Sequence, residues 1–543
     1  MSGVVIESNQ ELTVNILLLL LLLYFLITNK LRKTFINNVS PGKTMVWGFV
    51  KKVIDYFEKN NTPLILFVAT FFGIIFIRNL LEIFSTGYEA DIESHFHYFI
   101  CYTSIICAFI ILFKYATFEK IERIIKVILL FSIVLFLAPL IDLIANLGDK
   151  TMIEYMVPAG TESVLFSFFT FFGETSVSLG MRLEMALILL YSFSYFFIKT
   201  NKVFRSLVFS FLLYLVLFFF GSLPITLDFL FSSYNFDVSM QIYYHIIFAI
   251  MTFFLLLWIG YLYDKSKFIA LLKDIRALRI MHYLLFFIFG LSVALNWSFD
   301  FSFFNYVEIF LCIVAITLAC LFSLFTNNIA DYKIDKISNQ TRPSVTGLIS
   351  NKEYVVLSVF ALVFTIMFSV LVGYYIMFLS LVFIGVYFLY SMPPWRLKRV
   401  PVFSKLMIAF NTFVVFLMGH YYIEGNLDAP FEYKILILVF FGLAINFIDI
   451  KDYRGDKHAG IMTLPTLIGK RKSQYLIGLF FFLAHVSSFF IFDILEGLFI
   501  LLLLLAFGVA QFYVVARRKY SEKPIFALYF VLFLILGVYL TQF

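Results

Sequence analysis

The sequence predicts an all-α protein that crosses a membrane many times. Of its 543 residues, 62% are hydrophobic and only 14% are charged, a balance that soluble globular domains do not show. Many apolar runs reach the length of about 20 residues that spans a bilayer as a helix. The net charge of +7 is modest and is typical of Lys and Arg held on one side of a membrane, so we predict membrane lipid and no nucleic acid as a partner.

The first half of the chain contains seven predicted spanning helices. The opening residues, MSGVVIESNQEL, lack the basic start of a cleaved signal, so we expect the first apolar run to be retained as a helix. Another apolar segment, Ser163–Phe172, is too short to span, and we expect an outer-surface or re-entrant segment over about 160–180. The predicted spans are 13–29, 62–84, 97–115, 125–147, 183–199, 204–222 and 241–263.

The second half contains nine predicted spanning helices. A polar stretch at about 264–281 separates the halves, which predicts an N-terminal membrane domain (1–263), a cytoplasmic linker (264–281) and a second membrane domain (282–543). The predicted spans are 283–298, 306–327, 354–373, 374–392, 403–423, 433–450, 473–493, 495–516 and 525–542.

Basic residues in the second half fall in alternate connections between these spans. The connections near 299–305, 373, 424–432 and 493–496 contain no Lys or Arg, whereas the connections between them do. Because short cytoplasmic loops are enriched in Lys and Arg, the basic connections are predicted to be cytoplasmic. Nine helices then place the C-terminus outside. The same test in the first half, with Ser163–Phe172 not counted as a span, places the N-terminus outside.

Polar residues are concentrated in the first of these cytoplasmic connections, TNNIADYKIDKISNQTRP. Its Asn327, Asp331 and Asp335 are spaced by four residues, which places them on one stripe of a helix that continues from the membrane. Taken alone, this motif fits equally well a solvated helix end whose acids pair with Lys333 and Lys336.

A second acidic cluster on the predicted cytoplasmic side favours a metal site. The segment DIKDYRGDKHAG contains Asp449, Asp452 and Asp456 and also follows an apolar helix. Two clusters of carboxylate and amide oxygens suit Mg²⁺, which binds one or two carboxylates and leaves positions for phosphate oxygens. Cations in the same loops would suit a diphosphate, and our candidates are Arg342, Lys398, Arg399 and Lys457.

These motifs resemble those of the UbiA superfamily of intramembrane prenyltransferases. The family signature N-x-x-x-D-x-x-x-D is matched by the first cluster, and D-x-x-x-D is matched by Asp452 and Asp456. Between them, YSMPPWRLKR resembles the family's Y-S-x-P-P-x-R-L-K-R connection, and RPSVTG resembles its R-P-x-P-S-G segment. The resemblance covers about 280–543. The chain departs from the family at Asn328, where many members have Asp, and at Val345, where Pro is common.

The resemblance implies a nine-helix UbiA-type bundle that transfers a polyprenyl group with Mg²⁺ as cofactor. A polyprenyl diphosphate would be the donor, an unidentified lipophilic or interfacial molecule the acceptor, and diphosphate the released product. The implied metal contacts are Asn327, Asp331, Asp335, Asp449, Asp452 and Asp456. The implied catalytic residues are Asp331, Asp335, Asp452, Asp456 and Tyr390.

Several alternatives remain open from the sequence. A lyase or cyclase would use the same ionisation without an external acceptor, and a transporter or a non-catalytic scaffold would use the helices alone. The acceptor of a transferase could be a quinone or chlorin precursor, a glycerophosphate ether lipid or a phosphosugar. In the first half, Asp142, Arg182 and Glu184 lie in or beside apolar runs, where charges are candidates for function, but the role of residues 1–263 stays open.

Overall fold

The computed structural model describes residues 51–541, apart from 53, 60–63, 87–91, 146–163, 173–176, 232–239, 401–402, 459, 493–494 and 496. Helices and no strands form over these residues, and contacts divide the chain into two units, Met1–Lys265 and Ser266–Phe543. Fifteen helices in the described part are long and apolar enough to cross a membrane. The chain is therefore a multi-pass integral membrane protein with an all-α fold, as predicted.

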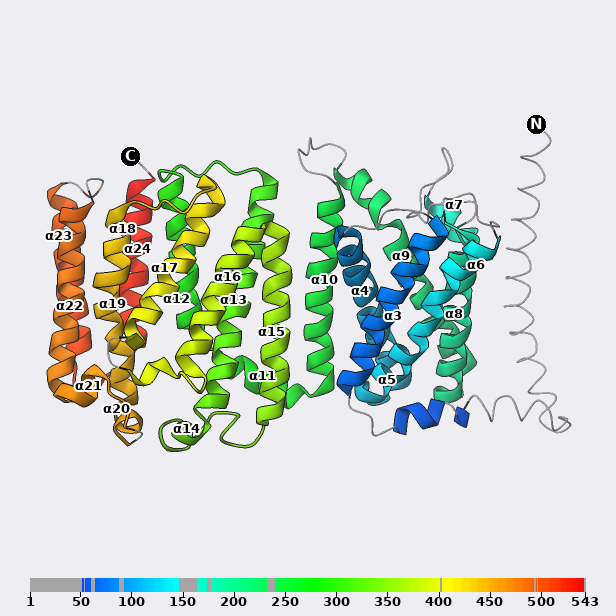
Figure 1. Ribbon diagram of the computed structural model, residues 1–543, viewed down its shortest axis with the longest axis horizontal. Helices are drawn as coiled ribbons and strands as arrows, with labels where there is room; N and C mark the ends of the chain where they lie inside the picture. The colour runs from blue at the N-terminus through cyan, green and yellow to red at the C-terminus, as the bar shows by residue number, and fades with distance from the viewer. Residues whose placement is uncertain are drawn as a thin grey trace, which may run out of the picture. The chain divides into compact units, whose positions relative to one another are not determined.

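The described part of the N-terminal unit contains six helical segments of spanning length (Figure 1). Each coincides with one of the predicted spans, while the remaining prediction, 13–29, lies outside the described residues. The helices are α3 (Leu64–Thr86), α4 (Ile92–Thr117), α5 (Ile121–Phe131), η1 (Ser132–Phe136), α6 (Leu137–Ala145), α7 (Val164–Phe169), α8 (Leu179–Thr200), α9 (Val203–Phe231) and α10 (Met240–Tyr263).

The apolar segment before α8 does not span. Its helix α7 has only 6 residues, whereas about 20 are needed to cross a bilayer. The chain turns directly after α7, because Phe171 and Phe172 both adopt positive φ values. Excluding Ser163–Phe172 from the spans was therefore correct.

All nine predicted spans of the C-terminal unit are present in the structure. The polar stretch 264–281 forms α11 and the first residues of α12. The helices are α11 (Lys265–Asp274), α12 (Ala277–Ala294), α13 (Phe303–Ala330), α14 (Tyr332–Ser338), α15 (Asn351–Val372), α16 (Tyr374–Ser391), η2 (Leu397–Arg399), α17 (Phe403–Glu424), α18 (Phe431–Ile435), η3 (Leu436–Phe441), α19 (Gly442–Ala444), η4 (Ile445–Ile448), α20 (Asp449–His458), α21 (Leu464–Ile468), α22 (Lys470–Ile491), α23 (Leu498–Ala516) and α24 (Lys523–Leu540).

Two of these helices begin at capping boxes that the local sequence provides. Ser302 caps α13 with Asn305, and Ser350 caps α15 with Glu353. In each box the serine hydroxyl accepts a hydrogen bond from a backbone N–H, and the partner side chain accepts one from the serine N–H. These contacts satisfy backbone donors that the first helical turn leaves unpaired.

Helices α12 and α17 pack unusually closely through a reciprocal pair of glycines. A Cβ atom on Gly290 would lie 2.0 Å from the Phe416 carbonyl oxygen, and one on Gly419 would lie 2.1 Å from the Phe287 carbonyl oxygen. Small residues let helices approach in a membrane, where the lipid provides no hydrophobic drive for association. This contact lies near the C-terminal ends of α12 and α17, and both helices contribute to the wall of the cavity described below.

The sixth spanning helix of the C-terminal unit changes its winding before the second acidic cluster. After α18, a π-helical segment (Leu436–Phe441) and a 3₁₀ segment (Ile445–Ile448) precede α20. Such local changes in winding alter which residues face a neighbouring helix, and they are frequent at functional sites. Helix α14, which carries the last residue of the first acidic motif, and helix α20, which carries the second motif, lie at the same end of the bundle (Figure 1).

Candidate active site

Both acidic clusters line one cavity at this end of the C-terminal unit. Its volume is about 180 Å³, and its walls come from α12, α13, α14, α16, η2, α17, η4, α20 and α24. Of the predicted site residues, those that line it are Asn327, Asp331, Asp335, Arg342, Tyr390, Lys398, Asp449, Asp452 and Asp456. Segments more than a hundred residues apart in the sequence thus share one cavity.

The first motif lies where α13 passes into α14. Asp331 separates the two helices, yet its N–H bonds to the Asn327 carbonyl at 2.8 Å, and the Asp335 N–H bonds to the Asp331 carbonyl at 2.9 Å. Because this four-residue bonding is kept, the three side chains remain on the stripe that their spacing predicts.

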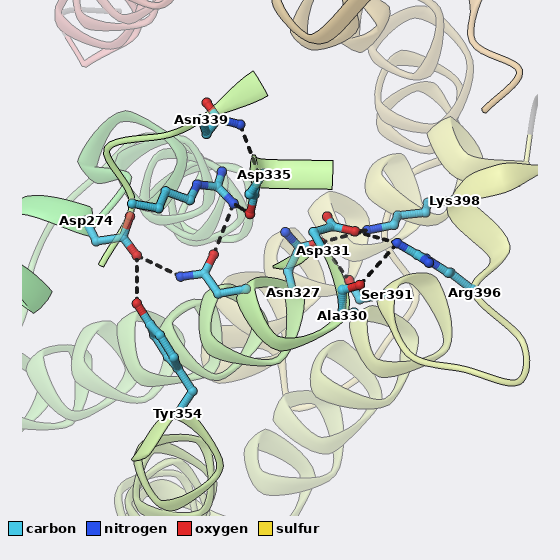
Figure 2. Close-up of polar contacts among 12 residues, drawn as sticks. Asp274, Asn327, Ala330, Asp331, Asp335, Asn339, Tyr354, Ser391, Arg396 and Lys398 are labelled. Atoms are coloured by element: carbon cyan, nitrogen blue, oxygen red, sulfur yellow. Dashed lines mark hydrogen bonds and ion pairs between the residues drawn. The ribbon is translucent and has the colours of Figure 1, made fainter. Parts of the chain in front are cut away.

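Lys398 connects Asn327 with Asp331 (Figure 2). Its Nζ lies 3.1 Å from Asn327 Oδ1 and 2.5 Å from Asp331 Oδ1, and Arg396 Nη2 lies 2.7 Å from the same Asp331 oxygen. Burial disfavours the charged carboxylate, but Lys398 and Arg396 outweigh it and hold the pKa of Asp331 below its ordinary value. Asp331 is therefore kept as a carboxylate beside the cavity.

Asp335 pairs with Arg342 and also accepts a hydrogen bond from Asn339 Nδ2 at 3.0 Å. The same arginine donates to Asn328 Oδ1 at 3.2 Å. In turn, Asn328 Nδ2 donates to Asp274 Oδ2 at 2.7 Å. Asn328 does not line the cavity; it links the first motif to α11 from behind.

The second motif presents its carboxylates from α20. Asp449 Oδ1 pairs with Lys405 Nζ at 2.6 Å, while Asp449 Oδ2 is buried without a hydrogen-bond partner among the described residues. Asp452 and Asp456 follow at three and seven residues, so all three share one helix face. All three line the cavity.

Two predicted diphosphate partners lie away from this cavity. Arg399 is exposed, although its neighbour Lys398 is buried and lines the wall. Lys457 is also exposed, and its Nζ lies 5.9 Å from the centre of the Tyr453 ring. Adjacent residues in a helix point in directions about 100° apart or more. Lys398 therefore faces the cavity while Arg399 does not, and Asp456 faces it while Lys457 does not.

Three other basic residues line the cavity in their place: Arg276, Arg279 and Lys405. Burial and the nearby Arg279 and Arg342 guanidinium groups lower the pKa of Arg276 to about 10. A cation disfavoured by neighbouring cations marks a place where an added anion would be bound. The sequence contains no motif at Arg276 or Arg279; their location at the start of a spanning helix on the predicted cytoplasmic side was the available signal.

Part of the cavity wall is apolar. Leu321, Ile408, Ile445 and Phe526 line it together with His282. His282 is fixed by Thr412 Oγ1 at 3.1 Å and by the Tyr529 hydroxyl. The cavity therefore has two parts, as an amphipathic substrate requires. We call the part lined by the acidic motifs and the cations the charged mouth, and the part lined by these apolar residues the hydrophobic interior.

The oxygen ligands in this cavity fit Mg²⁺ when part of its coordination comes from a substrate. Among the described residues, no three acidic, histidine or cysteine side chains are arranged to hold a metal by themselves. Mg²⁺ is commonly held by one or two carboxylates together with substrate phosphates. The unpartnered Asp449 Oδ2 provides a carboxylate oxygen of the required kind.

Comparison with known families assigns the C-terminal unit to one of them. Residues 283–536 match the model of the UbiA prenyltransferase family. The C-terminal half of the chain belongs to the UbiA family. The UbiA match covers every residue of both acidic motifs and all nine spans except the start of the first and the end of the last.

Relatives of the UbiA half include archaeal proteins named digeranylgeranylglyceryl phosphate synthase. The one from Pyrococcus horikoshii is 28% identical over 183 residues, 34% of this chain and 64% of that protein. The one from Pyrococcus furiosus is 30% identical over 166 residues, 30% of this chain and 57% of that protein. The chain thus spans less than two thirds of the length of either relative. A UbiA homologue from Archaeoglobus fulgidus, solved with DMAPP and Mg²⁺, aligns at 17% identity with a TM-score of 0.41, over 50% of this chain and 99% of that one.

Proposed function

We propose that the C-terminal half transfers a polyprenyl group from an allylic polyprenyl diphosphate to a lipophilic acceptor and releases diphosphate. The observation that carries the proposal is that both acidic motifs and a group of cations line one cavity whose interior is apolar. The charged mouth would hold the diphosphate, and the hydrophobic interior would hold the prenyl chain.

The reaction requires heterolytic cleavage of the allylic C–O bond. The electron pair leaves with the diphosphate, whose growing negative charge would be stabilised by Arg276, Arg279 and Lys405 at the cavity wall. Arg342 and Lys398 also line this wall, and each is positioned by a carboxylate of the first motif. Tyr390 lines the wall as well, where its ring face would stabilise an allylic cation.

The metal ligands in this proposal are Asn327, Asp331, Asp335, Asp449, Asp452 and Asp456. When bound there, Mg²⁺ would neutralise charge on the leaving diphosphate. Lys398 and Arg396 contribute to metal binding by keeping Asp331 ionised. Lys405 orients Asp449, because its Nζ pairs with Asp449 Oδ1.

For the acceptor, we propose a glycerophosphate ether lipid. The name shared by the relatives, digeranylgeranylglyceryl phosphate synthase, supports this choice. A free hydroxyl of the acceptor would form the new C–O bond with the allylic carbon, and its proton would pass to the released diphosphate. The cations at the charged mouth would also suit the phosphate of such an acceptor.

The test uses the purified full chain with radiolabelled geranylgeranyl diphosphate, geranylgeranylglyceryl phosphate and Mg²⁺. We expect a doubly prenylated lipid whose formation needs Mg²⁺ and falls at least 100-fold in Asp331→Asn and Asp452→Asn. Asp428→Asn, which changes an exposed acid in a distant connection, is the control and should retain activity. Diphosphate release without a prenylated lipid would favour a lyase, and an intact donor under all conditions would contradict the proposal.

A further inference from the structure

A second cavity is lined by the N-terminal unit, and among the described residues it shares none with the first. It has a volume of about 180 Å³ and is bounded by α3, α4, α8 and α9, with the α5–η1 segment. Aromatic side chains form much of its wall, including Phe109, Phe131, Phe172 and Phe220. An apolar cavity of roughly 150 Å³ is enough to bind benzene, so this one has room for a small apolar molecule.

A buried arginine lines this cavity. Arg78 is only 1% exposed, although it belongs to a helix that is long and apolar enough to span a membrane. Its Nη1 donates to the Leu135 carbonyl at 2.7 Å and lies 3.4 Å from Glu184 Oε2. Its guanidinium also lies over the Tyr102 ring, 4.9 Å from the centre. Charges at membrane depth are rare and usually functional.

Two hydrogen-bond donors that line the cavity are unused. In the described part of the chain, Arg78 Nε and the Tyr191 hydroxyl are buried and have no hydrogen-bond partner. Buried polar groups are nearly always hydrogen-bonded in native proteins. Unused donors on the wall of a single cavity therefore indicate a ligand with an acceptor oxygen.

The charge around Arg78 argues against an anionic ligand. Glu184 lies beside the guanidinium, and Glu82, which accepts a hydrogen bond from the Tyr98 hydroxyl, contributes a second nearby acid. The C-terminal cavity differs, because several arginines and lysines surround it. A phosphate or diphosphate in the N-terminal cavity would meet carboxylates without an excess of cations.

We propose that the N-terminal unit binds a neutral, mostly apolar molecule that carries an oxygen acceptor, such as a carbonyl or ether. The apolar body packs against the aromatic wall. The oxygen accepts a hydrogen bond from Arg78 or Tyr191. This inference concerns the N-terminal unit alone and does not depend on the reaction proposed for the other half.

Acetophenone is a suitable probe, because it is a neutral ketone with a single aromatic ring, which suits a cavity of this volume, and it inserts into neighbouring C–H bonds on irradiation. We would irradiate the purified full chain with deuterium-labelled acetophenone and map the insertions by peptide mass spectrometry. We expect labelling at Met181 and Met185, which line the cavity. Ethylbenzene has a similar shape but lacks the oxygen, and it should compete two- to tenfold more weakly than unlabelled acetophenone. Inorganic diphosphate with Mg²⁺ should not compete.

Three variants test whether the probe binds in this cavity. Ser192→Leu adds volume to the cavity wall and should abolish labelling of Met181 and Met185. Tyr191→Phe removes an unused hydroxyl but keeps the ring that stacks on Phe131 at 3.8 Å, and Arg78→Lys keeps the charge but removes Nε. At least one of these two should lower the labelling two- to tenfold, the range expected for one hydrogen bond.

The matched control is Ser210→Ala. Ser210 also has a buried hydroxyl without a partner among the described residues, but it does not line the cavity. Labelling should be unchanged in this variant. The proposal would be overturned by equal labelling in wild type, Ser192→Leu and both donor variants. Labelling confined to exposed lipid-facing residues of α3, such as Phe76 and Phe84, would overturn it equally.

Discussion

Asn328 shows how one residue can depart from a family motif without disturbing it. Its side chain is 0% exposed and uses both ends of the amide, because the oxygen accepts from Arg342 and the nitrogen donates to Asp274. An aspartate at this position could not donate to Asp274. The amide is therefore matched to the acidic residue on α11, and the residues of this motif that we propose as metal ligands, Asn327, Asp331 and Asp335, are unchanged.

This pairing predicts the effect of restoring the common family residue. Asn328→Asp would place two carboxylates at the 2.7 Å separation now occupied by a hydrogen bond, and removing such a buried partner costs about 1–3 kcal/mol. We expect a lower thermal midpoint and a prenyl transfer rate reduced about tenfold or more. Adding Asp274→Asn should recover most of both losses, measured as a double-mutant cycle. Equal stability of the single variant and wild type would refute this account.

Lys398 and Arg399 provide a second test at single-residue resolution, because they are adjacent and differ in location. Lys398 contacts both Asn327 and Asp331, whereas Arg399 is exposed and lies away from the cavity. We expect Lys398→Met to lower the rate of prenyl transfer at least 100-fold, since it removes a cation from the site and releases Asp331. Arg399→Met should stay within about threefold of wild type in the same assay. Similar losses in both variants would contradict the placement of the site.

At the scale of elements, the sequence predicts spans and motifs well because both depend on local patterns. Apolar length alone locates all nine helices of the C-terminal unit, and four-residue spacing places Asn327, Asp331 and Asp335 on one face. The winding of the sixth span was not predictable, because the π-helical and 3₁₀ segments (Leu436–Phe441 and Ile445–Ile448) carry no distinctive residue pattern. The cations of α12 and α17 were missed because only tertiary packing brings Arg276, Arg279 and Lys405 to the acidic motifs.

The packing of α12 against α17 predicts a large effect from a small substitution. Gly419→Ala places a methyl group against the Phe287 carbonyl oxygen, and overpacking of this kind typically costs about 1–3 kcal/mol. We expect a lower thermal midpoint and reduced transfer, because Arg276 and Arg279 lie at the start of α12. Gly385→Ala in α16 is the control, since a Cβ atom there meets nothing within 4 Å. An unchanged thermal midpoint in Gly419→Ala would contradict this prediction, because it would mean that α12 and α17 can move apart without loss of stability.

At the scale of the whole molecule, both units share one rule of charge placement. In the N-terminal unit, Lys114, Lys120 and Arg123 surround the connection between α4 and α5. In the C-terminal unit, the connections that carry the acidic motifs are also basic, whereas the connection that contains Asp428 has no Lys or Arg. Because Lys and Arg are retained on the cytoplasmic side, we predict that the proposed active site opens to the cytoplasm and that Asp428 lies outside.

Cysteine accessibility in intact cells measures this topology directly. The background variant replaces Cys101, Cys107, Cys312 and Cys320 with alanine, which is compatible with their buried or half-buried positions. Single cysteines are then introduced at three exposed sites, as Lys120→Cys, Lys352→Cys and Asp428→Cys. A membrane-impermeant maleimide should label Asp428→Cys in intact cells but label the other two only after permeabilisation. If Lys352→Cys were labelled in intact cells, the acidic motifs would face outward, and a diphosphate made in the cytoplasm could not reach them.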